Sequence, residues 1–265
     1  MKRQIKDYLR FGWQMINGER LAHERSLANI RSADLAPYVN GSQSLCVLDL
    51  ANGQLCPQLF LLLADGHRVY GIDKVNQIKA SWEYRAYQVA RRLYSRQILS
   101  LSTKRDNTLV CGDVAQLPFP ENCFDLVTSI AAFEHFLEIP LVVKEIRRVT
   151  RPGGLIWVWI HPFTCLSGGH NVSLTEVPLR SLPFGIAPWD HLRERILPFH
   201  VPLNEWRINQ YLNAFSSHFE LLKHYCAMRE GAAFLTQQIE RELSEYTRDE
   251  LTCGGFVILA RKHST

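Results

Sequence analysis

The sequence lacks several features that would place it in a specialised class of protein. Its seven cysteines are dispersed and include no Cys-x-x-Cys pair, so reduced, buried thiols are favoured over disulfides or a zinc site. No apolar run is long enough to span a bilayer, and the first residues lack the apolar core of a signal peptide. We therefore expect a cytoplasmic protein with no transmembrane segment.

The chain also lacks a strong charge imbalance, an internal repeat and a low-complexity segment. A net charge of +4 over 265 residues argues neither for nor against nucleic acid. Because no separate basic domain is present, we expect no nucleic-acid partner. With 46% hydrophobic residues, the chain can bury a sizeable core as a single domain, residues 1–265.

An alternation of strand and helix patterns runs from residue 45 to residue 160. The apolar run 45–50 is typical of a strand buried on both faces, and the helix-forming run 55–64 follows a short turn. A second strand at 68–73 completes a βαβ unit. Further strands are expected at 108–111, 124–130 and 155–160, with a helix at 140–149 and a tight turn at 151–154. This alternation predicts an α/β fold with a parallel, doubly wound sheet.

The segments outside this core have different patterns. Helical spacing over residues 1–40 predicts a helical cap, for which packing against the sheet is favoured over a role as a lid. Residues 161–202 are rich in Pro, Gly and His and predict an irregular segment on the substrate side. Residues 203–265 predict closing elements: helices at 203–215 and 234–246, and strands at 219–228 and 255–260.

A long helix with basic and aromatic residues is expected at 80–100. Its arginines could contact acidic lipid at a membrane surface or a phosphorylated substrate. A solvated charged face is the commoner explanation, and we favour it.

Three acidic residues follow or end successive predicted strands, and specific motifs accompany them. Gly-Asp-Val-Ala-Gln-Leu-Pro-Phe occupies 112–119 and is followed by Phe-Asp-Leu-Val at 124–127, while Arg-Pro-Gly-Gly at 151–154 precedes an apolar strand. With these motifs the chain resembles the small-molecule, type 11-like members of the class I S-adenosylmethionine-dependent methyltransferases, from about residue 45 to residue 160. The resemblance implies a methyltransferase with a Rossmann-like, mostly parallel seven-stranded sheet and an antiparallel last strand. It implies S-adenosylmethionine as the cofactor and S-adenosylhomocysteine as the product.

The resemblance also assigns roles to the strand-end acids. Asp49 would lie near the amino group of the methionine part, Asp73 would accept from both ribose hydroxyls, and Asp113 would accept from the adenine amino group. The complete set of implied cofactor-binding residues is Asp49, Ala51, Asn52, Gly53, Asp73, Lys74, Asp113, Val114, Ser129 and Ile130.

The turn after the first strand departs from the family pattern at Leu55, where a third small residue is usual. The turn fits the Gly-x-Gly-x-x-Gly motif of dinucleotide-binding proteins less well, so S-adenosylmethionine is favoured over NAD. Leu55 keeps open a second hypothesis, in which the protein retains the fold and serves in binding or scaffolding without catalysis.

Methyl transfer mainly requires alignment of an acceptor, and a general base helps when the acceptor is a hydroxyl. Histidine has a suitable pKa, and the candidates are His161, His170 and His135, the last with an orienting role favoured. Trp189, Asp190 and His191 either complete the acceptor pocket or pin a loop. Because no His-x-x-His or Glu-x-x-His spacing occurs, no metal site is predicted.

The expected reaction is O-methylation of a small hydroxylated molecule or a glycan. The sequence lacks Asn-Pro-Pro-Tyr, which adenine- or glutamine-directed methyltransferases use around a planar amine.

Overall fold

The computed structural model describes residues 18–41, 43–76, 82–99, 107–170, 186–199 and 201–264. Predictions that fall on residues 1–17 or 171–185 lie outside this part of the chain. The chain separates into two compact units, residues 1–113 and 114–265, here called the N-terminal and C-terminal units. Organisation as a single domain stays a prediction.

Seven strands form one mixed sheet in the order β3-β2-β1-β4-β5-β7-β6. β7 is antiparallel to both strands that it pairs with, whereas the pairs β1–β2, β2–β3 and β4–β5 are parallel. This arrangement confirms the predicted Rossmann-like sheet with an antiparallel last strand.

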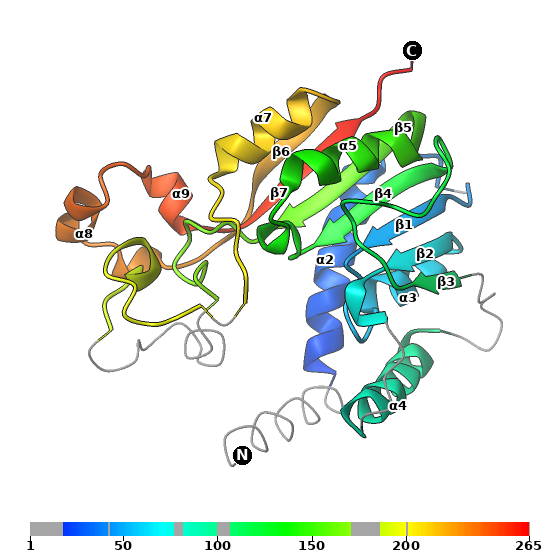
Figure 1. Cartoon of the computed structure of the whole chain (residues 1–265), viewed down its shortest axis with the longest axis horizontal. Coiled ribbons are helices and arrows are strands. Elements are labelled where there is room, and N and C mark those ends of the chain that lie inside the picture. The colour runs from blue at the N-terminus through cyan, green and yellow to red at the C-terminus, as the bar shows by residue number, and fades with distance from the viewer. Residues whose placement is uncertain are drawn as a thin grey trace. The chain divides into compact units, whose positions relative to one another are not determined.

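In the N-terminal unit, β1 (Cys46–Leu50), β2 (Arg68–Ile72) and β3 (Asn107–Val110) lie side by side (Figure 1). Every residue of β1 is buried, as expected of an apolar run in a parallel sheet covered on both faces. β2 and β3 each end one residue earlier than predicted, whereas β1 ends at Leu50 as expected.

The helices of this unit are α2 (Glu19–Leu35), α3 (Pro57–Ala64) and α4 (Trp82–Ile98), with a 3-10 turn η1 (Lys74–Asn76) after β2. Pro57 occupies the first turn of α3, where its missing N–H costs nothing. Helix α2 contacts α3, and the Arg31 guanidinium donates to Gln58 Oε1 at 2.8 Å. The predicted helix at 55–64 therefore begins two residues late, because Leu55 and Cys56 belong to the preceding turn.

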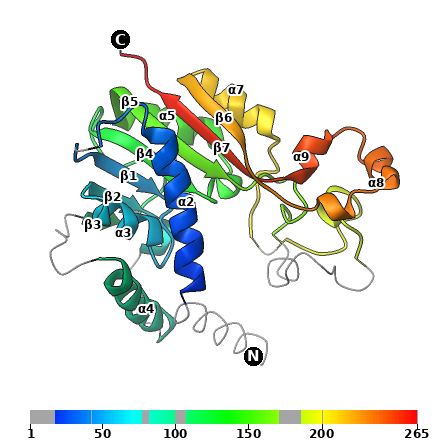
Figure 2. The same cartoon turned by 180° about the vertical axis from the view of Figure 1, so that it is seen from behind.

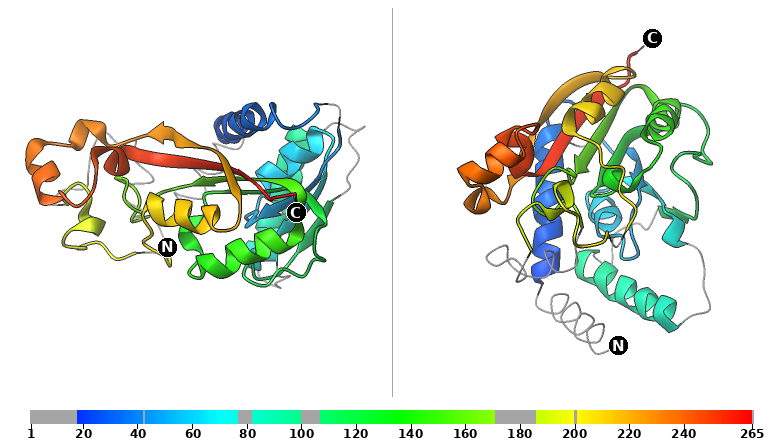
Figure 3. Two further views of the ribbon diagram at one scale, coloured as in Figure 1. Left: turned by 90° about the horizontal axis from the view of Figure 1, so that it is seen from above. Right: turned by 60° about the vertical axis from the view of Figure 1, so that its left-hand side comes forward.

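In the C-terminal unit, the chain runs from β4 (Phe124–Ile130) through α5 (Ile139–Val149) to β5 (Thr150–Ile160). The long strands β6 (Glu220–Arg229) and β7 (Cys253–Arg261) pair with each other (Figure 2). Helix α7 (Ile208–Ser216) contacts α5, β6 and β7, and it lies on the same side of these strands as α5 (Figure 3).

The Arg-Pro-Gly-Gly motif is not a turn that precedes a strand, as predicted, but a bulge inside β5. The register with β4 passes from Phe124 opposite Thr150 to Leu126 opposite Leu155, which leaves extra residues in β5. Gly153 takes a left-handed φ of 74° and donates its N–H to the carbonyl of Lys262 at 2.9 Å.

Two predicted helices near the C-terminus are corrected by the structure. The helix expected at 203–215 begins only at Ile208, since the Asn204 side chain accepts from the Trp206 N–H and holds a turn there. The helix expected at 234–246 is interrupted: η4 (Ala232–Phe234) and α8 (Gln237–Glu242) are followed by a separate α9 (Arg248–Thr252). Thr236 and Thr247 each cap a new helix.

None of the helices in the described ranges is both long and apolar enough to cross a membrane.

Candidate functional site

The turn that follows β1 is held by the acid that follows β2. Asp73 Oδ2 accepts from the Gly53 N–H at 2.9 Å, and Asp73 Oδ1 accepts from the Val75 N–H at 2.9 Å. Gly53 has a φ of 66°, a conformation that glycine adopts without steric cost. A carboxylate offers about four acceptor positions, so Asp73 retains capacity for further donors while it fixes the turn.

Asn52 joins the ends of the strands of this unit. It is buried, donates to the Gly53 carbonyl at 2.8 Å, and accepts from Asn76 Nδ2 at 3.1 Å. Asn76 in turn donates to the Val110 carbonyl at the end of β3 at 2.9 Å. A Cβ at Gly71 would lie 2.8 Å from Asn52 Oδ1, so only glycine leaves room for this side chain.

Asp49 lies inside β1, one residue before its end, and is only 3% exposed. Its Oδ2 has no hydrogen-bond partner among the described residues. Burial raises the Asp49 pKa to about 7, and the buried Arg31 guanidinium opposes this shift. An orphaned carboxylate oxygen of this kind fits the amino group that the resemblance assigns to it, because burial is costly until a donor satisfies the oxygen.

Lys74 and Asp113 are brought together at the surface. Lys74 Nζ lies 2.8 Å from Asp113 Oδ2, and the two side chains are 75% and 49% exposed. Such an exposed pair contributes little to stability. Ala51, with a φ of 53°, donates its N–H to the Ile72 carbonyl at 2.8 Å.

All seven predicted cofactor residues of the N-terminal unit thus lie at or next to the carboxyl ends of its three strands.

The other three predicted cofactor residues belong to the C-terminal unit. Ser129 is buried and Ile130 is half-buried at the end of β4, while Val114 is buried in the loop after Asp113. The motif that continues from Val114 is held by α5: Glu145 accepts from the Leu117 N–H at 2.8 Å, and Arg148 donates to the Leu117 carbonyl at 2.8 Å.

The C-terminal unit brings the three predicted histidines together. The His170 ring lies between the other two, with ring centroids 4.7 Å from His135 and 5.0 Å from His161. His135 ends the short helix η2 (Phe133–His135), His161 directly follows β5, and His170 lies further along the loop after β5.

His161 is oriented by a hydrogen-bond chain. Its Nδ1 lies 2.8 Å from the Gly254 carbonyl, so Nδ1 carries the proton because a carbonyl can only accept. Its Nε2 lies 3.0 Å from Ser167 Oγ. Glu230 accepts from the Ser167 N–H at 2.7 Å, and its carboxylate lies 2.9 Å from Ser167 Oγ, so the single hydroxyl proton can be donated either to Glu230 or to His161 Nε2. The serine hydroxyl thus stands between an imidazole and a carboxylate.

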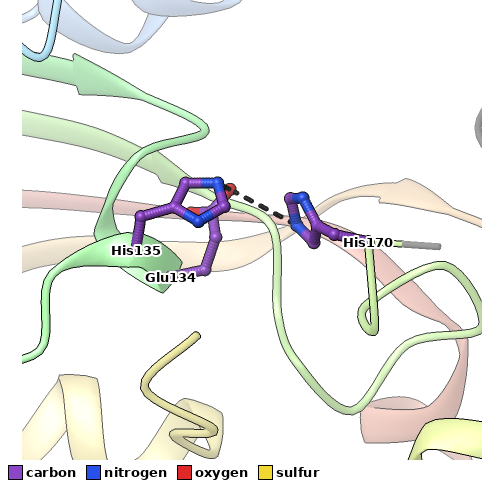
Figure 4. A group of neighbouring side chains, drawn as sticks. All are labelled: Glu134, His135 and His170. Atoms are coloured by element: carbon purple, nitrogen blue, oxygen red, sulfur yellow. Dashed lines mark ion pairs between the residues drawn. The ribbon is translucent and has the colours of Figure 1, made fainter. Parts of the chain in front are cut away.

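Glu134 is the site residue that the sequence analysis missed. It is 1% exposed, and its Oε1 lies 3.9 Å from His170 Nε2 and 4.0 Å from His135 Nε2 (Figure 4). No hydrogen bond of good geometry reaches either Glu134 oxygen or His170 Nε2 within the described ranges, although the backbone N–H groups of Glu134 and His161 lie close enough to oppose the rise in the Glu134 pKa. Burial raises the pKa of Glu134 to about 7, and burial, with His161 next in effect, lowers the pKa of His170 to about 3. The only sequence signal was its position directly before His135.

Trp189, Asp190 and His191 all make internal contacts. Trp189 is fully buried and donates to the Leu251 carbonyl at 3.2 Å, while the His191 Nε2–H donates to the Phe163 carbonyl at 2.8 Å. Asp190 accepts from two backbone N–H groups of its own loop, those of residues 196 and 197. These contacts are those of the loop-pinning alternative, and a role toward substrate stays a prediction.

The parallel sheet with an antiparallel last strand defines the class I methyltransferase fold, which solved structures share. A protein of Pyrococcus horikoshii matches with a TM-score of 0.51 and 21% identity over 89% of this chain and 91% of that chain. A SAM-dependent methyltransferase of Methanosarcina mazei matches with a TM-score of 0.50 and 17% identity over 87% and 97%. At these identities the likeness shows the fold alone.

Sequence comparison supports a methyltransferase domain over part of the chain. A family model described as a methyltransferase domain matches residues 48–158, and this segment is therefore a methyltransferase domain of the class I type, for which S-adenosylmethionine is the implied cofactor. The sterol 24-C-methyltransferase of Pneumocystis carinii is 28% identical over 167 residues, 60% of this chain and 41% of that protein. The chain thus spans less than half the length of this curated relative.

Proposed function

We propose that the protein transfers a methyl group from S-adenosylmethionine to a hydroxyl of a small molecule or a glycan. The observation that carries the proposal is the hydrogen-bond chain at His161, which holds one imidazole nitrogen as an acceptor beside two further histidines. The methyltransferase domain at 48–158 supports catalysis over the scaffold hypothesis. Leu55 is 6% exposed and buried within the N-terminal unit, which weakens the reason for that hypothesis.

The residues of the N-terminal unit fit the cofactor. Asp73 would accept from the ribose, Asp113 from adenine, and the orphaned Asp49 oxygen from the amino group, with Ala51, Asn52, Gly53 and Lys74 around them. Val114, Ser129 and Ile130 of the C-terminal unit complete the set by resemblance. When bound, S-adenosylmethionine supplies an electrophilic methyl group on a sulfonium sulfur.

His161 is assigned the role of proton acceptor. An acceptor hydroxyl must lose its proton as its oxygen gains the methyl group, and a positioned imidazole contributes typically about 10²–10⁴-fold to such a step. The Gly254 carbonyl fixes the proton on Nδ1, so Nε2 is the nitrogen that would receive another, with the neighbouring Ser167 hydroxyl then donating to Glu230 instead of to Nε2. His170 and His135 would line the acceptor side, and Trp189, Asp190 and His191 would support the loop around it.

A second candidate function is C-methylation of an isoprenoid acceptor. Its support is the similarity over 60% of this chain to a protein named sterol 24-C-methyltransferase and over 65 residues, at 38% identity, to the demethylmenaquinone methyltransferase of Corynebacterium glutamicum. Val89 and Leu93 of α4 are 55% and 53% exposed among basic residues, which fits peripheral contact with a membrane that holds such an acceptor. A cytoplasmic location stays an expectation.

Calorimetric titration with S-adenosylmethionine and S-adenosylhomocysteine, with NAD as a control, tests the cofactor. Micromolar binding of the S-adenosyl pair alone is expected. Methyl-labelled cofactor is then offered with sugars, phenols, sterols and quinones, and the labelled position is located by NMR. Label on oxygen supports the first proposal and label on carbon supports the second, whereas cofactor binding with no transfer to any acceptor would favour the scaffold hypothesis.

A further inference from the structure

Three potential metal ligands lie close together in the C-terminal unit, and two of them have buried polar atoms without a hydrogen bond. Glu134 is buried with both carboxylate oxygens unpartnered within the described ranges, and His170 Nε2 is likewise unpartnered there. Buried polar atoms in native proteins are nearly always satisfied, and a bound ion is one of the explanations for an exception. We propose that Glu134, His135 and His170 bind one divalent transition-metal ion.

The distances suit such an ion with small adjustments. Ligand atoms of the three residues all lie within 4.8 Å of one another, and Glu134 Oε1 is 3.9–4.0 Å from the two Nε2 atoms. In a tetrahedral site with bonds of about 2.0–2.1 Å, ligand atoms are separated by roughly 3.3 Å. Small rotations of the side chains, which the view in Figure 4 shows converging, would close the difference.

The protein orients His135 as metal-binding histidines are usually oriented. Its Nδ1 lies 3.0 Å from the Pro202 carbonyl, so Nδ1 carries the proton and Nε2 is left as a ligand atom. Asn204 fixes the short helix η2 that presents this ring: its Nδ2 donates to the Phe133 carbonyl at 2.7 Å, and its N–H donates to the Glu134 carbonyl at 2.9 Å. The site is therefore held by a second layer of hydrogen bonds.

The separation of His170 from Glu134 and His135 in the chain explains why sequence spacing gave no metal prediction. Adjacent residues on a helix point in different directions, so Glu134 and His135 by themselves form no recognisable ligand motif. Here η2 ends after one turn, and His170 approaches from a loop in which it takes a left-handed φ of 49°. Such a conformation is uncommon for a non-glycine residue.

A neighbouring cluster provides an internal contrast. His161, Cys165 and Glu230 also lie close enough to hold an ion, but their groups already satisfy one another through Ser167. Burial raises the pKa of the Cys165 thiol, which disfavours the thiolate that a metal needs. The unsatisfied cluster, not this one, is the metal site.

Two imidazoles and one carboxylate suit Zn²⁺ or Fe²⁺ better than Mg²⁺ or Ca²⁺, which prefer oxygen ligands. Three protein ligands leave a position for an added oxygen, and the 32% and 21% exposure of His135 and His170 gives access from their side. An acceptor hydroxyl bound there would have a lowered pKa beside the His161 base. This role rests on the proposed methyl transfer; metal binding itself does not.

The test is titration of the metal-free protein, residues 1–265, with Co²⁺, followed by absorption spectroscopy. One equivalent is expected, with d–d bands of nitrogen and oxygen donors and no thiolate charge-transfer band. A charge-transfer band would place the ion at Cys165 and overturn the proposal, as would the absence of any d–d band. Because this readout uses the wild-type protein, it does not depend on the folding of a variant.

Variants supply the residue assignment. Zn²⁺ affinity measured by calorimetry is expected to fall more than about 100-fold in Glu134→Gln and His170→Ala, and to stay within about twofold in His224→Ala, an exposed histidine of β6 whose loss removes no assigned ligand. Equal affinity in all proteins would overturn the proposal. Titration of S-adenosylhomocysteine into the metal-free protein reports separately on the proposed function, so either idea can fail alone.

Discussion

The Gly53 N–H donates to Asp73 Oδ2 at 2.9 Å, so the acid after β2 is a structural part of the turn after β1. The family resemblance assigns both residues to the cofactor, but it does not show that one holds the other in place. Loss of the Asp73 carboxylate should therefore affect the turn and the cofactor together.

Asp73→Ala is expected to weaken S-adenosylhomocysteine binding and to lower the free energy of unfolding. Each effect should be about 1–3 kcal/mol, because the change removes an acceptor from the ligand and leaves the Gly53 and Val75 N–H groups unpaired. Calorimetry and urea denaturation measure the two effects. Asp73→Asn keeps one carbonyl oxygen and should lose less stability; an unchanged dissociation constant in Asp73→Ala would refute the ribose assignment.

Cofactor affinity is expected to increase as the pH rises from 5.5 to about 7. The pKa of Asp49 is raised to about 7, so below that pH the carboxyl must lose a proton before it can pair with an ammonium group. Affinity should fall up to about tenfold per pH unit below 7. Calorimetry with S-adenosylhomocysteine over this range measures the slope, and Asp49→Asn should abolish it. A slope retained in Asp49→Asn would assign it to another group.

The same pKa shift predicts a pH dependence of stability that needs no ligand. Because folding raises the Asp49 pKa, its contribution to stability is complete below the usual value of 3.8 and is lost as the pH rises toward about 7. Urea denaturation of wild type and Asp49→Asn should show that the difference in unfolding free energy shifts in favour of the variant between pH 5 and pH 8. A constant difference would mean that Asp49 does not titrate in this range.

His161→Ala and His170→Ala should leave cofactor affinity nearly intact and lower turnover on the true acceptor. Loss of the base at His161 is expected to reduce kcat about 10²–10⁴-fold. Steady-state kinetics with methyl-labelled cofactor measure this, and His224→Ala serves as a matched control on an exposed histidine. Wild-type turnover in both variants would remove the two histidines from the mechanism.

Gly71→Ala is expected to destabilise the N-terminal unit by about 1–3 kcal/mol, because overpacking a filled interior forces neighbours to move. The added Cβ would lie 2.8 Å from Asn52 Oδ1 and 2.8 Å from Leu59 Cδ1. Gly41→Ala is the control, since a Cβ there meets nothing within 4 Å, and it should change stability by less than about 0.5 kcal/mol. Equal urea midpoints for the two variants would contradict the packing argument.

The strand positions could be predicted because they depend on local composition. Runs such as 45–50 and 124–130 are apolar throughout, and a parallel sheet buries both faces of its strands. The acids at 73 and 113 were predictable for the same reason, since they stand where an apolar run stops. Helix boundaries were less predictable: α7 begins at Ile208 because Asn204 holds a turn before it, and the Asn204 amide is itself fixed by the carbonyls of Phe133 and Phe136, more than sixty positions earlier.

The candidate site divides in the same way. The sequence predicted the acids, the turn and the three histidines as site residues, because each stands beside a recognisable strand or motif, and their roles stay predictions. The value of Glu134 depends on tertiary structure, since only burial and the approach of His170 distinguish it from an ordinary surface acid.

The sequence by itself thus determined the order of strands and helices, the family and the chemical groups at the strand ends, all of which follow from residues close in the chain. The tertiary structure decided which of these groups meet, which are satisfied by hydrogen bonds and which are left buried without a partner. Those properties arise from contacts between distant residues, where removal from water sets the cost of every unpaired polar atom.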